Sequence, residues 1–210
     1  MTNQDSPIVF VVDDDRRVRE ALSRLIGSAG LAVTTFATAG EFLAYEKPDA
    51  PACLILDLQL PGVSGLELQQ QLTEADAPPI VFLTGHGDVP STVRAMKAGA
   101  VEFLLKPVGD QELLRAIAAA VELDREARRK RSELEGLRER YALLTPRERE
   151  VLPFVIAGLA NKMAAGDLGI AENTIAVHRG QIMRKMGSRS VAELVRMADK
   201  LGISPADPLR

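Results

Sequence analysis

Acidic side chains, a hydroxyl and a lysine follow the ends of several apolar segments in the first half of the chain. Three aspartates occupy positions 13–15 directly after one such segment, and Asp57 follows another. Carboxylates brought together repel one another, so they take up protons or bind a hard cation such as Mg²⁺, which prefers oxygen ligands. Thr84 and Lys106 follow two further segments and offer a hydrogen bond and a positive charge, which a transferred phosphoryl group needs. The set indicates phosphorylation of an aspartate.

Five short apolar, β-branched-rich runs would position these residues. Segments with helical apolar spacing lie between the runs, for example around Val93 and Met96. Strands that alternate with helices predict βαβ units and a parallel sheet covered on both faces, and carboxyl ends of parallel strands share one edge. We therefore expect a flavodoxin-like α/β domain of five strands. The predicted strands are Ile8–Val12, Ala32–Phe36, Cys53–Leu56, Ile80–Leu83 and Val101–Leu105.

Composition excludes several classes of protein. The 210 residues are 46% hydrophobic, which argues against a disordered chain, and a single cysteine, Cys53, excludes a disulfide framework and a Cys-based zinc site. The chain shows neither an apolar run of about 18 residues nor a secretory start, so we expect a cytoplasmic protein without a membrane partner. Of the net charge of −3, residues 1–124 carry −9 and residues 125–210 carry +6. Such asymmetry indicates two domains with different partners.

The second half of the chain has helical patterns only. We predict a first domain over residues 1–124, a helical linker over 125–142 and an all-α domain of four helices over 143–210. The linker carries a mixed-charge run, and its apolar residues recur at spacings of 3 and 4. A solvated linker helix is the preferred interpretation, and a short coiled-coil seam between two protomers is the alternative. The residues concerned are Leu134, Leu137, Tyr141 and Leu144.

Helix-boundary residues divide the last domain clearly. Thr145 and Glu148 form a capping-box pattern, and Ser190 and Glu193 repeat it. Between them a short helix, 161–168, and a longer one, 172–186, each end at a glycine, which is the order of a helix-turn-helix. On the longer helix, Ile175, Ile182 and Met186 share one face. The opposite face carries Asn173, Ala176, Val177, Gly180, Gln181 and Arg184.

The motifs of the first domain resemble the receiver domain of bacterial two-component response regulators. These motifs are VVDDD, LILDLQLPGVSG, VFLTGHGDV and MKAGAVEFLLKP. The resemblance implies that Asp57 accepts phosphate, with Thr84, Lys106 and the aromatic switch residue Phe103 around it. It also implies a Mg²⁺ site and a cis bond before the proline that follows Lys106. The ligands so implied are Asp13, Asp14, Asp57 and the main-chain carbonyl of Gln59.

The last domain resembles the LuxR-type DNA-binding domain, through LTPRERE and GLANKMAAGDLGIAENTIAVHRGQIMRKMG. Together the two halves resemble the NarL/FixJ family over residues 7–202. The resemblance implies phosphate contacts from Lys162, Thr174 and Arg179, and base contacts from Val177 on the recognition face. The remaining donors to bases on that face are Asn173, Gln181 and Arg184.

These resemblances predict a transcription factor that is not an enzyme. A sensor histidine kinase would phosphorylate Asp57, and the segment 89–106 would then support a homodimer that binds promoter DNA, with RNA polymerase as a further partner. Two alternatives stand beside this. A phosphatase of the haloacid-dehalogenase type also uses an Asp-x-Asp, but it needs a late acidic pair after a further strand. A degenerate receiver would act without phosphate, although Asp14, Asp57, Thr84 and Lys106 are all present.

Overall fold

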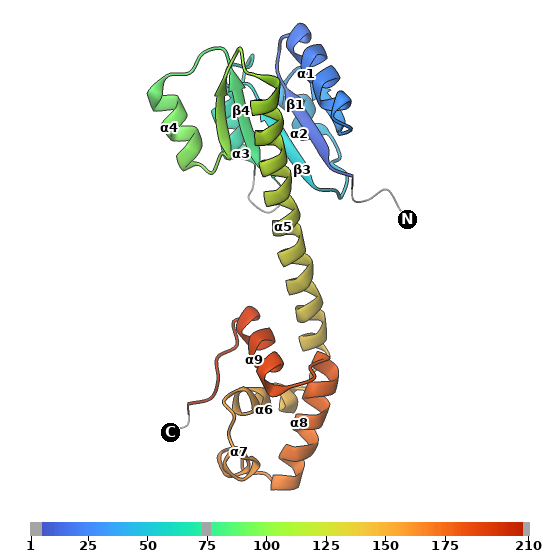
Figure 1. The fold of residues 1–210 in the computed structure, drawn as a ribbon. Helices are drawn as coiled ribbons and strands as arrows, with labels where there is room; N and C mark the ends of the chain where they lie inside the picture. The colour runs from blue at the N-terminus through green and yellow to red at the C-terminus, as the bar shows by residue number, and fades with distance from the viewer. Residues whose placement is uncertain (1–5, 73–76, 208–210) are drawn as a thin grey trace. The chain divides into compact units, whose positions relative to one another are not determined.

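The first half of the chain contains one parallel β-sheet (Figure 1). The structure, a computed structural model, describes residues 6–72 and 77–207. The strands lie in the order β2-β1-β3-β4-β5, and every neighbouring pair is parallel, which confirms the predicted flavodoxin-like sheet. Their bounds are β1 Ile8–Val12, β2 Ala32–Phe36, β3 Ala52–Leu56, β4 Ile80–Thr84 and β5 Glu102–Leu105. Three limits therefore differ from the predictions by one residue, and Thr84 ends β4 rather than following it.

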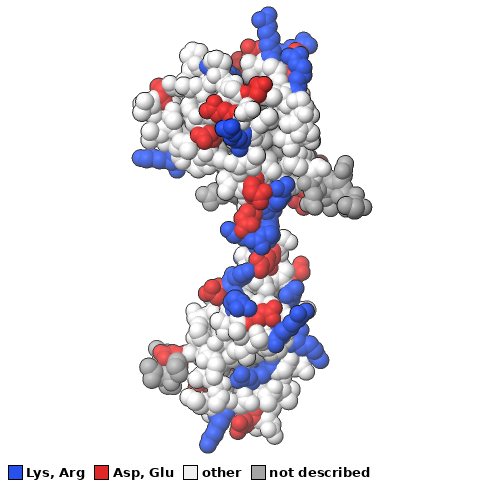
Figure 2. Space-filling model, in the orientation of Figure 1, with Lys and Arg blue, Asp and Glu red and all other residues white. Residues whose placement is uncertain are grey.

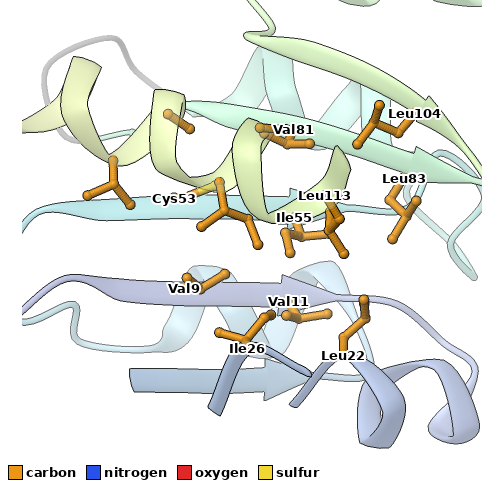
Figure 3. Packing of buried hydrophobic residues seen from close by; sticks show 14 residues of the cluster. Val9, Val11, Leu22, Ile26, Cys53, Ile55, Val81, Leu83, Leu104 and Leu113 are labelled. Atoms are coloured by element: carbon orange, nitrogen blue, oxygen red, sulfur yellow. The ribbon is translucent and has the colours of Figure 1, made fainter. Parts of the chain in front are cut away.

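Helices cover both faces of this sheet. The central strands alternate their side chains between the faces, so that Val9 and Ile55 pack with α1 and α5, as Figure 3 shows. On the other face Phe10 and Leu54 pack with α2, α3 and α4. All residues of β3 and β4 are buried, as expected of a parallel sheet with two covered faces. The helices are α1 Arg16–Ser28, α2 Ala39–Ala44, α3 Gly65–Gln71, α4 Val89–Lys97 and α5 Asp110–Ala142.

Helix α4 is the least anchored of the longer helices on the sheet. It buries only Ser91 and Ala95, both small side chains. Val93 and Met96, whose spacing predicted an apolar helical face, are 44% and 42% exposed. The helix is therefore present as predicted, but this face points to solvent rather than into the core.

Helix α5 carries residues of both compact units of the chain, 1–128 and 129–210. In its middle, basic and acidic side chains are interspersed (Figure 2). Arg128 pairs with Asp124 at 2.7 Å and also with Asp49. The buried Asp124 carboxylate in turn accepts from the Ala52 N–H at 2.8 Å, which ties α5 to the first residue of β3.

The apolar residues at the end of α5 and just beyond it pack within the second unit. Leu144 belongs to the core of that unit, and Tyr141 packs against the same core. Leu137 is also buried, at 5% exposure. Packing within the chain accounts for Leu137, Tyr141 and Leu144, whereas Leu134 is half-buried, and the coiled-coil seam stays an alternative prediction.

The second unit consists of helices, as predicted. They are α6 Pro146–Ile156, α7 Asn161–Leu168, α8 Glu172–Met186 and α9 Val191–Lys200. The capping box of Thr145 and Glu148 is complete. At α9 only half of the predicted box forms, because the Glu193 carboxylate accepts from the N–H of Arg189 rather than from that of Ser190. Gly169 and Gly187 end their helices with φ of 64° and 70°, in the left-handed region that favours glycine.

Candidate functional site

Three carboxylates meet at the carboxyl edge of the sheet. Asp13 and Asp14 follow β1, and Asp57 follows β3, so the parallel register brings them together. One oxygen from each can be chosen so that all three lie within 4.8 Å of one another. Asp13 and Asp57 are buried, whereas Asp14 is exposed. Such a set of oxygen donors, open on one side, suits a hard divalent cation.

Lys106 supplies the positive charge of this cluster. Its Nζ donates to Asp13 Oδ2 at 2.6 Å and to Asp57 Oδ2 at 2.7 Å. Burial alone would lower the pKa of Lys106, but the two hydrogen-bonded carboxylates outweigh it and hold the pKa above its ordinary value. Burial raises the pKa of Asp13, although the ammonium group of Lys106 acts in the opposite direction. The bond between Lys106 and Pro107 is cis, as the resemblance implied.

Thr84 and Phe103 lie on the two neighbouring strands. The Thr84 hydroxyl is fully buried and accepts from the His86 N–H at 3.3 Å. Its own hydrogen has only a contact of 3.5 Å with the His86 carbonyl, at the limit of a hydrogen bond. The ring of Phe103 stacks on Phe82, with 5.8 Å between centroids. Thr84 can therefore donate to a new oxygen without giving up a strong bond.

The loop after Asp57 is held by an unusually close approach of two backbone segments. The Gly65 N–H donates to the Leu58 carbonyl at 2.9 Å. A Cβ atom at Gly65 would lie 2.2 Å from the Asp57 carbonyl oxygen, a distance that real Cβ atoms do not show. The Gln59 N–H donates to Asp57 Oδ1 at 3.2 Å. Only glycine at position 65 allows α3 to begin this close to Asp57.

Helix α8 presents the second candidate surface. Ile175, Ile182 and Met186 are fully buried, which confirms the predicted core face of this helix. Val177 on the opposite face is 61% exposed, unusual for a branched apolar side chain. Among the other predicted contact residues, exposed positions are Lys162, Asn173, Thr174 and Arg184, while Arg179 and Gln181 are half-buried.

Two of these predicted contact residues have partners within the domain. Arg179 donates to the Leu159 carbonyl at 2.9 Å, which ties α8 to the turn before α7. Arg184 donates to the Gln181 side chain. Neither α7 nor α8 receives a side-chain cap, since alanine precedes each of them.

An ion pair between the buried Glu148 and the half-buried Lys185 joins α6 to α8. Glu148 accepts from Lys185 Nζ at 2.7 Å and from the Thr145 N–H at 2.7 Å. Burial would raise the pKa of Glu148, but Lys185 and the Thr145 N–H together hold it below its ordinary value. The pair joins the start of α6 to the last turn of α8 and so helps to fix the recognition helix.

Comparison with known proteins identifies both halves. Residues 9–118 match the response regulator receiver domain, and residues 142–198 match the luxR family of bacterial regulatory proteins. The transcriptional regulatory protein FixJ of Azorhizobium caulinodans is 44% identical over 200 residues, which cover 95% of each chain. The chain belongs to the NarL/FixJ family of two-component response regulators. Such a regulator is a transcription factor rather than an enzyme, as predicted.

Other NarL/FixJ relatives match most of the chain. Nodulation protein W of Bradyrhizobium diazoefficiens is 50% identical over 94% of this chain and 87% of its own. The solved structure of the response regulator StyR shares 52% identity, with a TM-score of 0.84 over 93% of this chain and 99% of its own. A receiver implies a histidine kinase as partner, and a LuxR-type helix-turn-helix implies DNA binding.

Membership of the NarL/FixJ family also removes the phosphatase alternative. The late strand with an acidic pair that a phosphatase requires does not occur, because β5 is followed only by helices up to residue 207. Within the described parts of the chain, no helix has both the length and the apolar character needed to span a membrane.

Two contacts of this regulator are not predicted by the sequence pattern. Arg19 donates to the Asp13 and Asp14 carbonyls at 2.6 and 2.9 Å, so a second cation braces the acidic loop. The sequence signal for this contact is the position of Arg19 one turn into α1, shortly after the acidic residues. Gln69 is buried and donates a hydrogen bond to a carbonyl of α4. No sequence pattern indicates this contact, because a glutamine within a helix of polar residues resembles a solvent-exposed one.

Proposed function

We propose that phosphorylation of Asp57 by a histidine kinase controls dimerisation and sequence-specific DNA binding of this regulator, and so controls transcription. The observation that carries the proposal is the position of Lys106, whose ammonium group contacts both the Asp13 and the Asp57 carboxylates. This is the charge arrangement that an incoming phosphoryl group needs. The same proposal includes the limits of the first domain, the linker and the last domain, at 1–124, 125–142 and 143–210, and a cytoplasmic location.

The proposed chemistry is a transfer of one phosphoryl group. An Asp57 carboxylate oxygen forms a bond to phosphorus while the bond from phosphorus to the donor imidazole nitrogen breaks, and the bonding electrons stay on the imidazole. Lys106 then pairs with a phosphoryl oxygen, and the Thr84 hydroxyl donates to another. Thr84 moves toward the phosphoryl group as it forms this bond, and the ring of Phe103 rotates in consequence.

A divalent cation completes the site in this proposal. Asp13, Asp14, Asp57 and the Gln59 main-chain carbonyl would hold Mg²⁺, and the acidic group brought together by the fold suits it. When bound, Mg²⁺ neutralises charge on the phosphoryl oxygens during transfer. Gln59 and His86 lie beside the site and, by resemblance, influence the lifetime of the phosphate.

The face formed by α4 and β5 is the proposed dimer contact. Val89 is 76% exposed, Leu105 54%, Val93 44% and Met96 42%, so apolar side chains cluster on one face. Two linked DNA-binding domains reading a near-palindrome gain avidity over one. An RNA polymerase contact remains an additional proposed partnership.

The first prediction tests the phosphorylation step. Incubation of the full chain with Mg²⁺ and a small phosphodonor should add the mass of one phosphoryl group, seen by intact mass spectrometry. Chelation of Mg²⁺ and the substitution Asp57→Ala should each abolish the addition. Absence of added mass on the unchanged chain, or equal addition to Asp57→Ala, would favour a degenerate receiver that acts without phosphate.

The second prediction separates two kinds of DNA contact. In the proposal Lys162, Thr174 and Arg179 contact phosphates, whereas Asn173, Val177, Gln181 and Arg184 face the bases. Lys162→Ala should weaken binding to all sequences and reduce the salt slope by about one. Val177→Ala should weaken binding to the specific site by about fivefold, through loss of a methyl contact, with no change in salt slope.

Fluorescence anisotropy at several salt concentrations measures both effects. The DNA fragment comes from sequencing genomic DNA that co-purifies with the protein. Binding that does not depend on salt, or the same loss of affinity on specific and random DNA for Val177→Ala, would contradict the assignment.

A further inference from the structure

Helix α4 depends on polar contacts to hold its position. Its buried side chains, Ser91 and Ala95, are small, whereas α1 buries Leu22 and Ile26. Hydrophobic stabilisation grows with the apolar area removed from water, so α4 gains little from packing on the sheet. A single polar contact can therefore influence where this helix lies.

That contact comes from Gln69 on α3. Its Nε2 donates to the Ala95 carbonyl at 3.1 Å, in the last turn of α4, and to the carbonyl of Ala98, the residue that follows α4, at 3.2 Å. The Ala95 carbonyl also accepts from the Ala100 N–H at 3.1 Å, whereas the Ala98 carbonyl lies just past the last residue of α4, where carbonyls lack partners within the helix. Gln69 therefore caps this end of α4 from a neighbouring helix. This amide joins α3 to the carboxyl end of α4.

The same side chain includes an unfavourable feature. Gln69 is 8% exposed, and its Oε1 is the buried side-chain atom for which the described residues provide no hydrogen-bond partner. A buried acceptor left unpaired opposes the arrangement that contains it. The contact between α3 and α4 thus holds α4 through the Gln69 Nε2, while the Gln69 Oε1 is left unpaired.

Room for a movement of α4 lies beside this contact. An open pocket of about 950 Å³ lies between α3 and α4, lined by Leu66, Gln69 and Gln70 on one side and by Ser91, Arg94 and Ala98 on the other. Helix α3 itself begins at Gly65, against the Asp57 backbone. The helix that touches the phosphoacceptor at one end therefore holds α4 near the other.

We propose that Gln69 is a positioning residue that latches α4 in the arrangement in which Lys106 pairs with the free Asp57 carboxylate. Release of the latch lets α4 move, and so changes the position of the already exposed apolar face that α4 shares with β5. This connection between Asp57 and α4 runs through α3 and is separate from the one through Thr84 and Phe103. It rests on the proposed function, since the face it restrains is the proposed dimer contact.

The test is the substitution Gln69→Met in the full chain. Methionine has nearly the same length, so the chain should remain folded, and the unfolding midpoint in urea should fall only as far as the net loss of hydrogen bonding requires. Without phosphodonor, the dimer dissociation constant should fall about fivefold for each net hydrogen bond lost, measured by analytical ultracentrifugation. Amide exchange at residues 98–100 should accelerate.

Gln70→Met is the matched control, because Gln70 lies next on α3, lines the same pocket and is exposed. It should leave the dissociation constant and the exchange rates unchanged. The double variant with Asp57→Ala should keep the enhanced dimerisation, since the latch acts without phosphate. Gln69→Leu, which also lacks the amide, should repeat the result.

The outcomes separate the latch from the proposed function. If the unchanged chain gains no phosphate or does not dimerise upon phosphorylation, the proposed function is wrong. If it does both, but the Gln69 variants dimerise no better than Gln70→Met, the latch is wrong. Unfolding of both Gln69 variants would assign this side chain a purely structural role and would equally overturn the latch.

Discussion

Gly65→Ala is expected to reduce the rate of Asp57 phosphorylation at least tenfold and to lower the free energy of unfolding by about 2 kcal/mol. The added Cβ would lie 2.2 Å from the Asp57 carbonyl oxygen and 3.1 Å from the Leu58 Cα, both backbone atoms that cannot rotate away. The Asp57 loop or the start of α3 must therefore shift. A displacement of this kind moves the phosphoacceptor relative to Lys106, and small errors of position strongly slow transfer reactions.

Gly27→Ala is the matched control for this change. A Cβ at Gly27 meets nothing within 4 Å, and the residue lies inside α1, so alanine should be neutral or slightly stabilising. Urea unfolding and the time course of added phosphate by intact mass measure both effects. Equal behaviour of the two variants would show that the approach of α3 to Asp57 does not constrain the site.

Lys106→Met is expected to lower the free energy of unfolding without Mg²⁺ by about 2 to 3 kcal/mol, because it leaves two buried carboxylates without their counter-charge. Added Mg²⁺ should recover much of this loss. Its stabilising effect should exceed that on the unchanged chain, since no ammonium group then competes for Asp13 and Asp57. The variant should still accept some phosphate but should lose phosphorylation-dependent dimerisation.

Thermal unfolding with and without Mg²⁺ gives the measurement, and Lys97→Met, at an exposed lysine near the end of α4, is the control. An identical Mg²⁺ effect on the Lys106 variant and on the unchanged chain would mean that Lys106 and the cation do not share the site. A chelator should reverse the stabilisation that Mg²⁺ produces. A Lys106 variant that dimerises normally after phosphorylation would remove this residue from the proposed switch.

Local signals in the sequence were sufficient for most of the fold. Apolar, β-branched-rich runs predicted all five strands within one residue of their limits, because such runs favour strands whatever their partners. The strands β1, β3 and β4 are largely buried, whereas β2 and β5 bury one residue each. Helix limits in the second unit followed from Thr145, Gly169 and Gly187, whose capping roles depend only on neighbouring residues. Asp13, Asp14 and Asp57 were predicted to meet because parallel strands end at one edge.

The folded structure decided the features for which a local pattern allows more than one outcome. The half-formed box at α9 shows how a local pattern can leave the choice of donor open, since Glu193 reaches Arg189 instead of Ser190. The direction of the α4 apolar face was also open, because Val93 and Met96 have helical spacing whether they face the sheet or solvent. Spacing specifies a face, and packing specifies where that face points.

By itself, then, the sequence determined which groups reach the carboxyl edge of the sheet and which helix carries the recognition face. Only the folded chain determined that one ammonium group contacts both Asp13 and Asp57, and that Gly65 must approach Asp57 so closely. It likewise determined that Gln69 caps α4 from α3. Periodicity and capping act over a few residues, whereas these contacts join residues on different elements and exist only once the elements have packed.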